Sequence, residues 1–327
     1  MTLPLLSRRL LLGGAASLPM LARPALAQGA YPTRPIRVLV GWSPGGGVDV
    51  IARKLGQKLS ASLGQPVVIE NKAGGTGSIA AAEVARAAPD GHTLLALDNA
   101  YATLPYLFSQ LPFDHAKAFR LISITAFAPL FLGVKRDAPY ADLQALIATA
   151  RAKPDTVAYG TGGNGSVPHF NTLAFQRAAG VELFHVPFRG ANEAVLAVLS
   201  GTVQMVMVSV ASALGSLQSG DLRPLAISGA ARVAALPQAP TFAEAGLPGF
   251  EANAWYGLAA PHGTPDAIVD KLTSAMRAAL AEPDMLQFLD DLGAVPGGQS
   301  SEQAATILAA ETERWSGIAA SGGIERR

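Results

Sequence analysis

The 327-residue sequence contains no cysteine, which excludes disulfide bonds and attachment to a membrane through a lipidated cysteine. Charge is also scarce, because charged residues make up 15% of the chain and 25 Lys and Arg stand against 24 Asp and Glu. A strongly basic face is not expected from this balance, so we expect no nucleic-acid partner. If the ligand is an anion, local donors must hold it, since the overall field is close to neutral.

The first 27 residues have the pattern of an export signal. Paired arginines at positions 8 and 9 precede an apolar stretch, and Ala-Leu-Ala at 25–27 matches a small-x-small cleavage site. Glycines and a proline interrupt the apolar stretch, which disfavours a membrane span of about 20 residues. We therefore predict cleavage after Ala27 and a periplasmic mature protein. The paired arginines are typical of the twin-arginine route, although ordinary signal peptides also contain them.

The mature chain alternates between expected strands and helices, as in an α/β fold. Strands are expected at Ile36–Val40, Pro66–Glu70, Thr93–Leu97, Thr156–Tyr159, Glu182–Val186, Val203–Val208 and in "RPLAIS". Helices are expected after the first glycine loop to Leu63 and at Ile79–Ala88, Ala141–Ala152, Ala191–Ser200, Pro265–Ala281 and Glu302–Ile318. This order predicts a mostly parallel sheet flanked by helices, and a mature chain of about 300 residues suits two lobes.

The segment Gly41–Gly45, "GWSPG", matches the G-x-S-x-G pattern of a serine hydrolase. In such an elbow the residue after the serine donates its backbone N–H to the oxyanion hole, but Pro44 has no N–H. None of the five histidines can be assigned as the base for Ser43. We therefore expect no enzyme here, with a hydrolase as the weaker alternative.

Two other loops fit dinucleotide-binding patterns. Gly160–Gly165 reads G-x-G-x-x-G, and Gly75–Ala80 reads G-x-G-x-x-A with Asp98 where a ribose-binding acid would follow. Such matches are weak in a chain with 34 glycines, so an exported oxidoreductase stays an alternative function. No H-E-x-x-H pattern and no histidine pair at i,i+4 is present, so neither a metal nor a cofactor is expected.

What the two halves share is a strand, a glycine-rich loop and then a helix. Gly45–Gly47 precede a helix with Asp49 in its first turn, and Gly162–Ser166 precede a helix in the second half. Converging backbone N–H groups and the positive end of a helix dipole favour an anion. Two such anion-binding loops that face each other would hold a carboxylated molecule.

Several stretches keep the order and spacing of one family, among them "YPTRPIRVLVGWSPGGGVDVIARKL", "YGTGGNGSVPHF", "HVPFRGANEAV" and "LPQAPTFAEAGLPGFEANAWYGLAAPHGTP". Over nearly all of its mature length the chain resembles the Bug-type substrate-binding proteins of tripartite tricarboxylate transporters. The resemblance implies a two-lobed periplasmic binding protein fold (type II) with the ligand in a cleft between lobes that close by hinge motion. It also implies that the closed form engages membrane permease subunits, and we expect a monomer.

The lobes implied are residues 28–125 with 252–327, and residues 126–251. Two hinge crossovers are expected, near Ser123–Phe127 and Glu251–Trp255. The expected ligand-binding residues are Ser43, Pro44, Gly45, Gly46, Val48, Asp49, Thr76, Asn99, Thr161, Gly163, Asn164, Gly165, Ser166, His169 and Ser209.

Two of these positions depart from the family pattern. Val48 stands where threonine is usual, and Ser209 lies in a loop that often carries an acid. An amino-acid ligand would lack an acidic partner there unless Asp98 takes that role. The ligand therefore stays open among dicarboxylates, tricarboxylates, aromatic acids and amino acids.

Overall fold

A ten-stranded sheet with the order β2-β1-β3-β9-β4-β7-β5-β6 is the framework of the fold, and β8 and β10 pair with β4. The computed structural model describes residues 31–322, 324 and 326, so the predicted signal peptide lies outside the described residues. The strands are β1 (Ile36–Val40), β2 (Val67–Asn71), β3 (Thr93–Asp98), β4 (Phe119–Lys135), β5 (Ala158–Thr161), β6 (Phe184–Pro187), β7 (Met205–Ser209), β8 (Leu222–Ile227), β9 (Asn253–Pro261) and β10 (Val295–Pro296).

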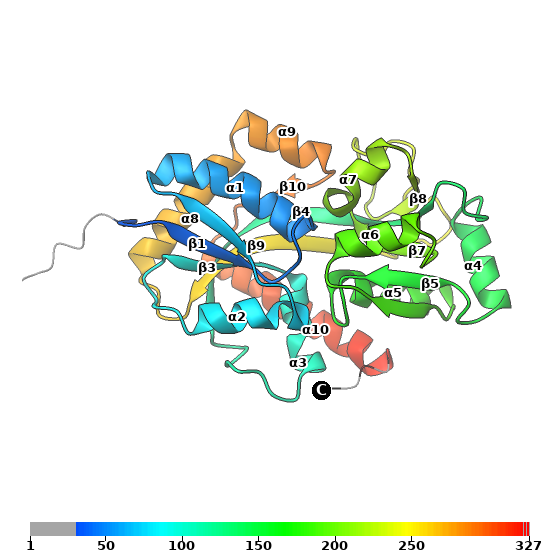
Figure 1. The fold of residues 1–327 in the computed structure, drawn as a ribbon, viewed down its shortest axis with the longest axis horizontal. Coiled ribbons are helices and arrows are strands. Elements are labelled where there is room, and N and C mark those ends of the chain that lie inside the picture. Colours follow the sequence, from blue (N-terminus) through cyan, green and yellow to red (C-terminus); the bar gives the residue numbers. More distant parts are fainter. Residues whose placement is uncertain (1–30, 323, 325, 327) are drawn as a thin grey trace, which may run out of the picture. The chain divides into compact units, whose positions relative to one another are not determined.

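Helices cover the sheet, and Figure 1 shows α1 and α2 on opposite sides of the strands that they flank. The α-helices are α1 (Gly47–Leu63), α2 (Ser78–Ala85), α3 (Leu104–Leu107), α4 (Leu143–Ala152), α5 (Val167–Ala179), α6 (Ala191–Leu199), α7 (Val210–Gln218), α8 (Asp266–Leu280), α9 (Pro283–Asp291) and α10 (Ser301–Ser321). Two short 3-10 helices are η1 (Gly75–Gly77) and η2 (Asn99–Thr103). No helix in the described part of the chain is both long and apolar enough to span a bilayer.

Parallel strands form both ends of the sheet, as the alternating pattern predicts. β1 pairs in parallel with β2 and β3, and β5 pairs in parallel with β6 and β7. The helix after β1 ends where expected, because Gly64 adopts a left-handed conformation (φ 70°) and its N–H donates to the Ser60 carbonyl. Five other helices that the sequence predicts correspond to α2, α4, α6, α8 and α10. Their ends differ from the predicted ends by at most three residues.

The middle of the sheet corrects the expectation of a mostly parallel arrangement. β9 is antiparallel to β3 and β4, and β4 is antiparallel to β7, β8 and β10. β4 and β9 are mostly apolar and mostly buried, so neither shows a regular alternation of polar and apolar residues along the sequence. The sheet is therefore mixed, with antiparallel strands joining two parallel groups.

β4 connects the two groups directly. Its residues up to Pro129 pair with β9, whereas from Leu130 onward they pair with β7 and β8. The start of β9, at Asn253, lies opposite Pro129. The change of partner thus falls close to the expected crossovers, while the exact lobe boundaries stay a prediction.

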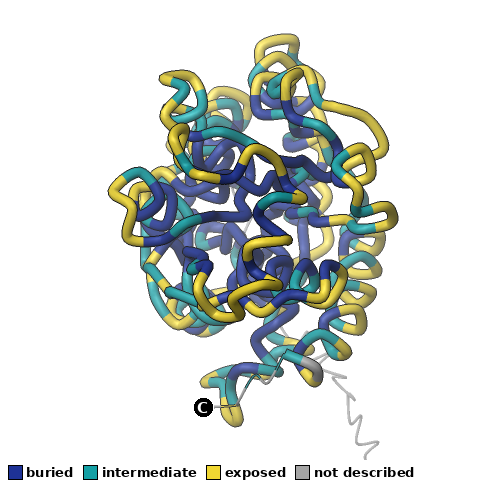
Figure 2. Tube along the Cα trace, turned by 90° about the vertical axis from the view of Figure 1, so that its right-hand side faces the viewer, coloured by how far each residue is buried: buried dark blue, intermediate teal, exposed yellow. Residues whose placement is uncertain are grey.

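Two separate hydrophobic clusters accompany the two groups of strands. The first includes Leu39, Leu97 and Trp315, and the second includes Phe131 and Val206. Figure 2 shows the buried residues along the inner strands and the exposed ones on the outer turns. Each parallel group thus has its own core, which fixes the loops at the ends of its strands.

Candidate functional site

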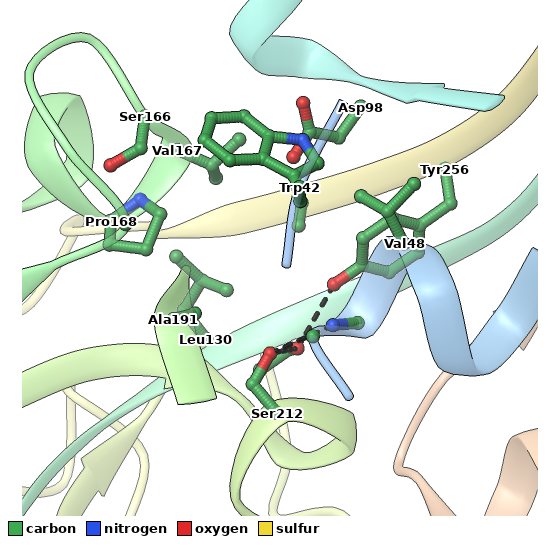
Figure 3. Close-up of a pocket in the computed structure, with 15 residues that line it drawn as sticks. Trp42, Val48, Asp98, Leu130, Ser166, Val167, Pro168, Ala191, Ser212 and Tyr256 are labelled. Carbon is green, nitrogen blue, oxygen red and sulfur yellow. Dashed lines mark hydrogen bonds between the residues drawn. The ribbon is translucent and has the colours of Figure 1, made fainter. Parts of the chain in front are cut away.

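A cavity with an empty volume of about 440 Å³ lies where the two parallel groups of strands meet. Figure 3 shows side chains from the β1–α1 loop, α5, α6, α7 and β9 pointing toward one space. The lining residues are Trp42, Gly46, Gly47, Val48, Asp98, Leu130, Gly162, Ser166, Val167, Pro168, Ala191, Ser209, Ser212, Ala254 and Tyr256.

Four helices begin at this cavity. The lining includes the N-cap or first helical residue of each: Gly46 for α1, Ser166 for α5, Ala191 for α6 and Ser209 for α7. No side chain caps the first turn of α1, α6 or α7 from the N-cap position. The positive ends of four helix dipoles therefore meet around one small space, which favours a negatively charged ligand.

A chain of hydrogen bonds closes one side of the cavity. The Tyr256 hydroxyl donates to Ser209 Oγ (3.0 Å), Ser209 Oγ lies 3.2 Å from Ser212 Oγ, and the Gly47 N–H donates to Ser212 Oγ (3.0 Å). A Cβ at Gly47 would lie 2.5 Å from the Tyr256 hydroxyl oxygen and 2.9 Å from Ser209 Oγ. Glycine at this position therefore allows α1 to approach α7 and β9 closely.

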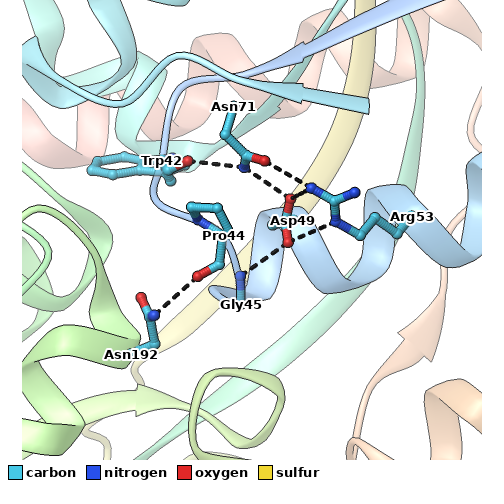
Figure 4. Close-up of polar contacts among 7 residues, drawn as sticks. All are labelled: Trp42, Pro44, Gly45, Asp49, Arg53, Asn71 and Asn192. Atoms are coloured by element: carbon cyan, nitrogen blue, oxygen red, sulfur yellow. Dashed lines mark hydrogen bonds and ion pairs between the residues drawn. The ribbon is translucent and has the colours of Figure 1, made fainter. Parts of the chain in front are cut away.

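Asp49, which does not line the cavity, holds the first loop. Its carboxylate accepts hydrogen bonds from the Gly45 N–H (2.9 Å), from Asn71 Nδ2 (2.8 Å) and from Arg53 (Figure 4). Asn71 Nδ2 also donates to the Trp42 carbonyl (3.0 Å). Burial raises the pKa of Asp49, but the hydrogen bonds from Arg53, Gly45 and Asn71 outweigh burial and keep it below its usual value. Asp49 therefore acts as an ionised anchor for the loop.

The first loop also contacts the second half of the chain. Ser43 Oγ donates to Glu193 Oε1 (2.9 Å), and Asn192 Nδ2 donates to the Pro44 carbonyl (2.9 Å). The hydroxyl that the hydrolase interpretation would use is thus bonded to a glutamate on α6. These contacts join the β1–α1 loop to the start of α6.

The second loop is held by histidines. The Gly165 N–H donates to His169 Nδ1 (3.0 Å), and the His169 ring stacks on His185 with centroids 4.1 Å apart. His185 Nε2 lies 2.6 Å from Thr161 Oγ1, which accepts from the Gly163 N–H (3.1 Å). Burial lowers the pKa of His169 to about 3, with a contribution from His185, and lowers that of His185 to about 4. Both rings are therefore neutral at pH 7.

A second cavity, with an empty volume of about 800 Å³, borders the first. The two cavities share Trp42 and Gly162, and Thr76, Gly163 and Asn164 line the second one. Thr76 Oγ1 donates to the Asn164 carbonyl (2.6 Å) and so joins the η1 loop to the second glycine loop. Thr76 does this from a left-handed conformation (φ 56°) that is rare for a β-branched residue.

The fifteen predicted positions separate into three groups. Gly46, Val48, Ser166 and Ser209 line the first cavity, and Thr76, Gly163 and Asn164 line the second. The others do not line either one: Ser43, Pro44, Gly45, Asp49, Asn99, Thr161, Gly165 and His169. Asn99 is buried, and its Nδ2 donates a hydrogen bond to the carbonyl of Asn253 at the start of β9 (3.1 Å). Whether any of the fifteen contacts a ligand stays a prediction.

The sequence interpretation missed several lining residues. Trp42 lay inside the hydrolase-like motif, and Gly47 was the third glycine of its run. Ser212 follows Ser209 by three residues, the spacing of one helical turn, which was a usable signal. Tyr256 and Ala254 come from β9, and no local pattern connects that strand with the glycine loops.

Asp98 lines the cavity at the end of β3 and is 8% exposed. It caps η2 by accepting from the Ala100 N–H (3.2 Å), and the Trp42 side chain hydrogen-bonds it as well. Burial raises the pKa of Asp98 to about 7, and the hydrogen bonds only partly oppose this effect. No group of three or more His, Asp or Glu suited to a metal ion occurs among the described residues.

Fold and cavity together define a two-lobed α/β solute-binding protein. The chain belongs to the family described as "Tripartite tricarboxylate transporter family receptor", whose model matches residues 51–324. It is 35% identical to Protein BugT of Bordetella pertussis over 88% of this chain and 89% of that protein. The Bug-type resemblance predicted from the sequence is therefore confirmed.

Two solved structures are similar along their whole length. MatC from Rhodopseudomonas palustris, described with bound malate, is 33% identical with a TM-score of 0.83, over 88% of this chain and 100% of that one. Rpa4515 of R. palustris, described with adipate, is 32% identical with a TM-score of 0.87, over 91% of this chain and 100% of that one. These similarities confirm the predicted fold class.

Proposed function

We propose that this protein is exported to the periplasm, captures a small carboxylate in the cavity at which α1, α5, α6 and α7 begin, and presents it to a membrane permease. The observation that carries the proposal is the convergence of four helix N-termini on one small space, three of them without a cap from the side chain of the N-cap residue. Malate and adipate, named with the similar structures, are the first ligands to consider.

The cavity supports carboxylate capture without a basic side chain. Among the described residues that line it, none is Lys, Arg or His. Backbone N–H groups at helix starts, with the lining serine hydroxyls, are then the donors for carboxylate oxygens. Hydrogen bonds to a charged group contribute roughly 1.5–3 kcal/mol each, so three or four, less the association cost, suffice for a micromolar complex.

The same proposal includes closure of two lobes around the ligand. The bonds from Ser43 to Glu193, from Asn192 to Pro44 and from Thr76 to Asn164 all join residues of the two proposed lobes. β4 and β9 are the strands that would carry the hinges. We propose boundaries at 125/126 and 251/252, and small-angle scattering should show compaction when a saturating ligand is added.

The binding test uses purified mature protein and calorimetric titration with malate, adipate, citrate and an aromatic dicarboxylate. At least one acid should bind with a micromolar or lower Kd, and its methyl ester should bind far more weakly. Ala191→Leu, which fills the cavity at the start of α6, should abolish binding, whereas the matched Ala310→Leu on the exposed face of α10 should not. Equal affinity for acid and ester, or unchanged binding by Ala191→Leu, would contradict the proposal.

The proposed export has its own test. Cell fractionation should place the protein in the periplasm, and N-terminal sequencing of that form should begin at Gln28. A protein that stays in the cytoplasm would remove the basis for delivery to a permease while leaving carboxylate capture intact.

A further inference from the structure

Asp98 sits in the cavity as its single acidic side chain among the described lining residues. Figure 3 shows its carboxyl group beside the indole of Trp42, on the side of the cavity where β3 ends. Its protein donors are the Ala100 N–H, the Trp42 side chain and its own backbone N–H. An acid in a space where four helix N-termini favour an anion is unexpected, because it competes with an anionic ligand.

Among the described residues that line the spaces beside Asp98, no side chain is a cation. Asp98 borders the ligand cavity and a smaller neighbouring space, and no Lys, Arg or His is among the described residues that line either one. The cation near the first glycine loop, Arg53, forms its ion pair with Asp49 and not with Asp98. A carboxylate here is therefore buried without a counterion, which disfavours its charged form.

The ionisable groups on the surrounding elements do not change this conclusion. Tyr256 on β9 and Tyr101 on η2 are buried, and burial raises the pKa of each above its usual value. Burial lowers the pKa of His169 on α5 to about 3, so that ring is neutral. Glu311 on α10 is an acid that hydrogen-bonds Asn99, the neighbour of Asp98, and burial raises its pKa. None of these groups supplies a positive charge at pH 7.

A bound carboxylate would bring a second negative charge into the same small space. Two carboxylates that share a buried site cannot both be ionised without a large cost, so one of them holds a proton. The helix N-termini stabilise the ligand's carboxylate, whereas Asp98 has no counterion. A protonated Asp98 also becomes a hydrogen-bond donor in the wall of the cavity.

We propose that Asp98 determines the protonation requirement of the site: it takes up one proton from solvent when a carboxylate ligand binds, and the protein binds ligand and proton together. This inference rests on the proposed function, since it needs an anionic ligand in the cavity. It has a measurable sign: affinity for a fully ionised ligand should fall as the pH rises above the pKa of Asp98 in the free protein.

Calorimetric titration with adipate and with malate tests this inference directly. Between pH 7 and pH 9 the carboxyl groups of both acids are ionised, so the ligand itself does not titrate. With a free-protein pKa of about 7, the affinity should fall roughly 50-fold over this range. Titrations at pH 8 in two buffers with different ionisation enthalpies should show uptake of nearly one proton per ligand bound.

Two variants complete the experiment. Asp98→Asn keeps the shape of the side chain but cannot titrate, so the proton uptake and the pH dependence should both vanish. Asp270→Asn, an exposed acid on α8, is the matched control and should keep the wild-type pH profile. The proton uptake of the wild-type protein decides the matter even where Asp98→Asn folds poorly.

The contrary results are distinguishable. Carboxylate binding by the wild-type protein without proton uptake would overturn the inference and leave the proposed function standing. Tighter binding of aspartate than of malate, lost in Asp98→Asn, would also overturn it and would assign Asp98 to a ligand ammonium group. If neither adipate, malate nor any other acid of the panel binds at pH 6, the proposed function fails and this inference fails with it.

Discussion

The two glycine loops have the same backbone design but different anchors. The first loop is held by an ionised carboxylate, Asp49, which bonds the Gly45 N–H, Asn71 and Arg53. The second is held by a neutral imidazole, His169, which accepts from the Gly165 N–H and stacks on His185. In both loops a side chain in the first turn of the following helix fixes a glycine N–H four residues earlier.

This difference shows that one loop geometry can be stabilised by opposite electrostatic means. The first anchor depends on the negative charge of Asp49, which hydrogen bonds stabilise. One of its partners, Arg53, has a side chain that is 47% exposed. The second depends on the absence of charge in a buried pair of rings. The two loops should therefore respond differently to acid and to substitution, although they serve one cavity.

The largest expected effect is the response of the second loop to acid. The pKa values of His169 and His185 are lowered by burial to about 3 and 4, from an ordinary value of 6.5. The unfolded chain therefore binds more protons than the folded one below pH 6.5, and stability falls as the pH falls from about 6.5 toward 4. Urea unfolding should show a loss of roughly 1.4 kcal/mol per pH unit for each histidine.

The double variant His169→Asn, His185→Gln provides the comparison. It cannot titrate at these positions, so its free energy of unfolding should depend less steeply on pH between 6.5 and 4. The exposed His262→Gln should retain the wild-type slope. A double variant with the wild-type slope would show that these two histidines do not cause the acid sensitivity.

The next effect concerns the first loop. Asp49→Ala removes the acceptor for the Gly45 N–H and for Asn71, and should lower the free energy of unfolding by about 2–3 kcal/mol at pH 7. Arg53→Ala removes only the partly exposed partner and should cost at most about 1 kcal/mol. Equal losses in the two variants would mean that the ion pair, rather than the loop hydrogen bonds, stabilises this region.

The smallest effect concerns a contact that reaches the second loop from η1. Thr76→Val removes the hydroxyl that donates to the Asn164 carbonyl but keeps the branched shape. This bond joins the two proposed lobes, so its loss, about 1 kcal/mol, should disfavour the closed arrangement and weaken ligand affinity roughly fivefold. Thr76→Ser keeps the hydroxyl and should bind like the wild-type protein. A Thr76→Val variant with unchanged affinity would show that the contact does not favour the bound form.

The sequence predicted the parallel groups well and the centre of the sheet poorly. β1 and α1 follow from an apolar run, three glycines and a helical stripe that ends at Gly64. β4 pairs along its length with residues that are more than 70 positions away, and its mostly apolar sequence has no period that identifies its partners. Such pairing depends on tertiary contacts, which no local window of sequence contains.

The same distinction holds for the candidate site. Both glycine loops were predicted because a run of glycines before a helix has a direct physical consequence for backbone donors. Asp98 was noticed only as a possible ribose or amine partner, since its burial next to Trp42 becomes visible only once β3 and the β1–α1 loop are placed together. Tyr256 had no signal, because its role depends on the close approach of α1 at Gly47.

The central claim is that helix N-termini hold a carboxylate in this cavity. A crystal structure of the mature protein with the tightest-binding acid of the panel tests it most directly. The account predicts carboxylate oxygens within hydrogen-bond distance of first-turn N–H groups of α1 and α5, directly or through one ordered water. A ligand whose carboxylate lies outside this cavity, held by side-chain cations at another place, would contradict it.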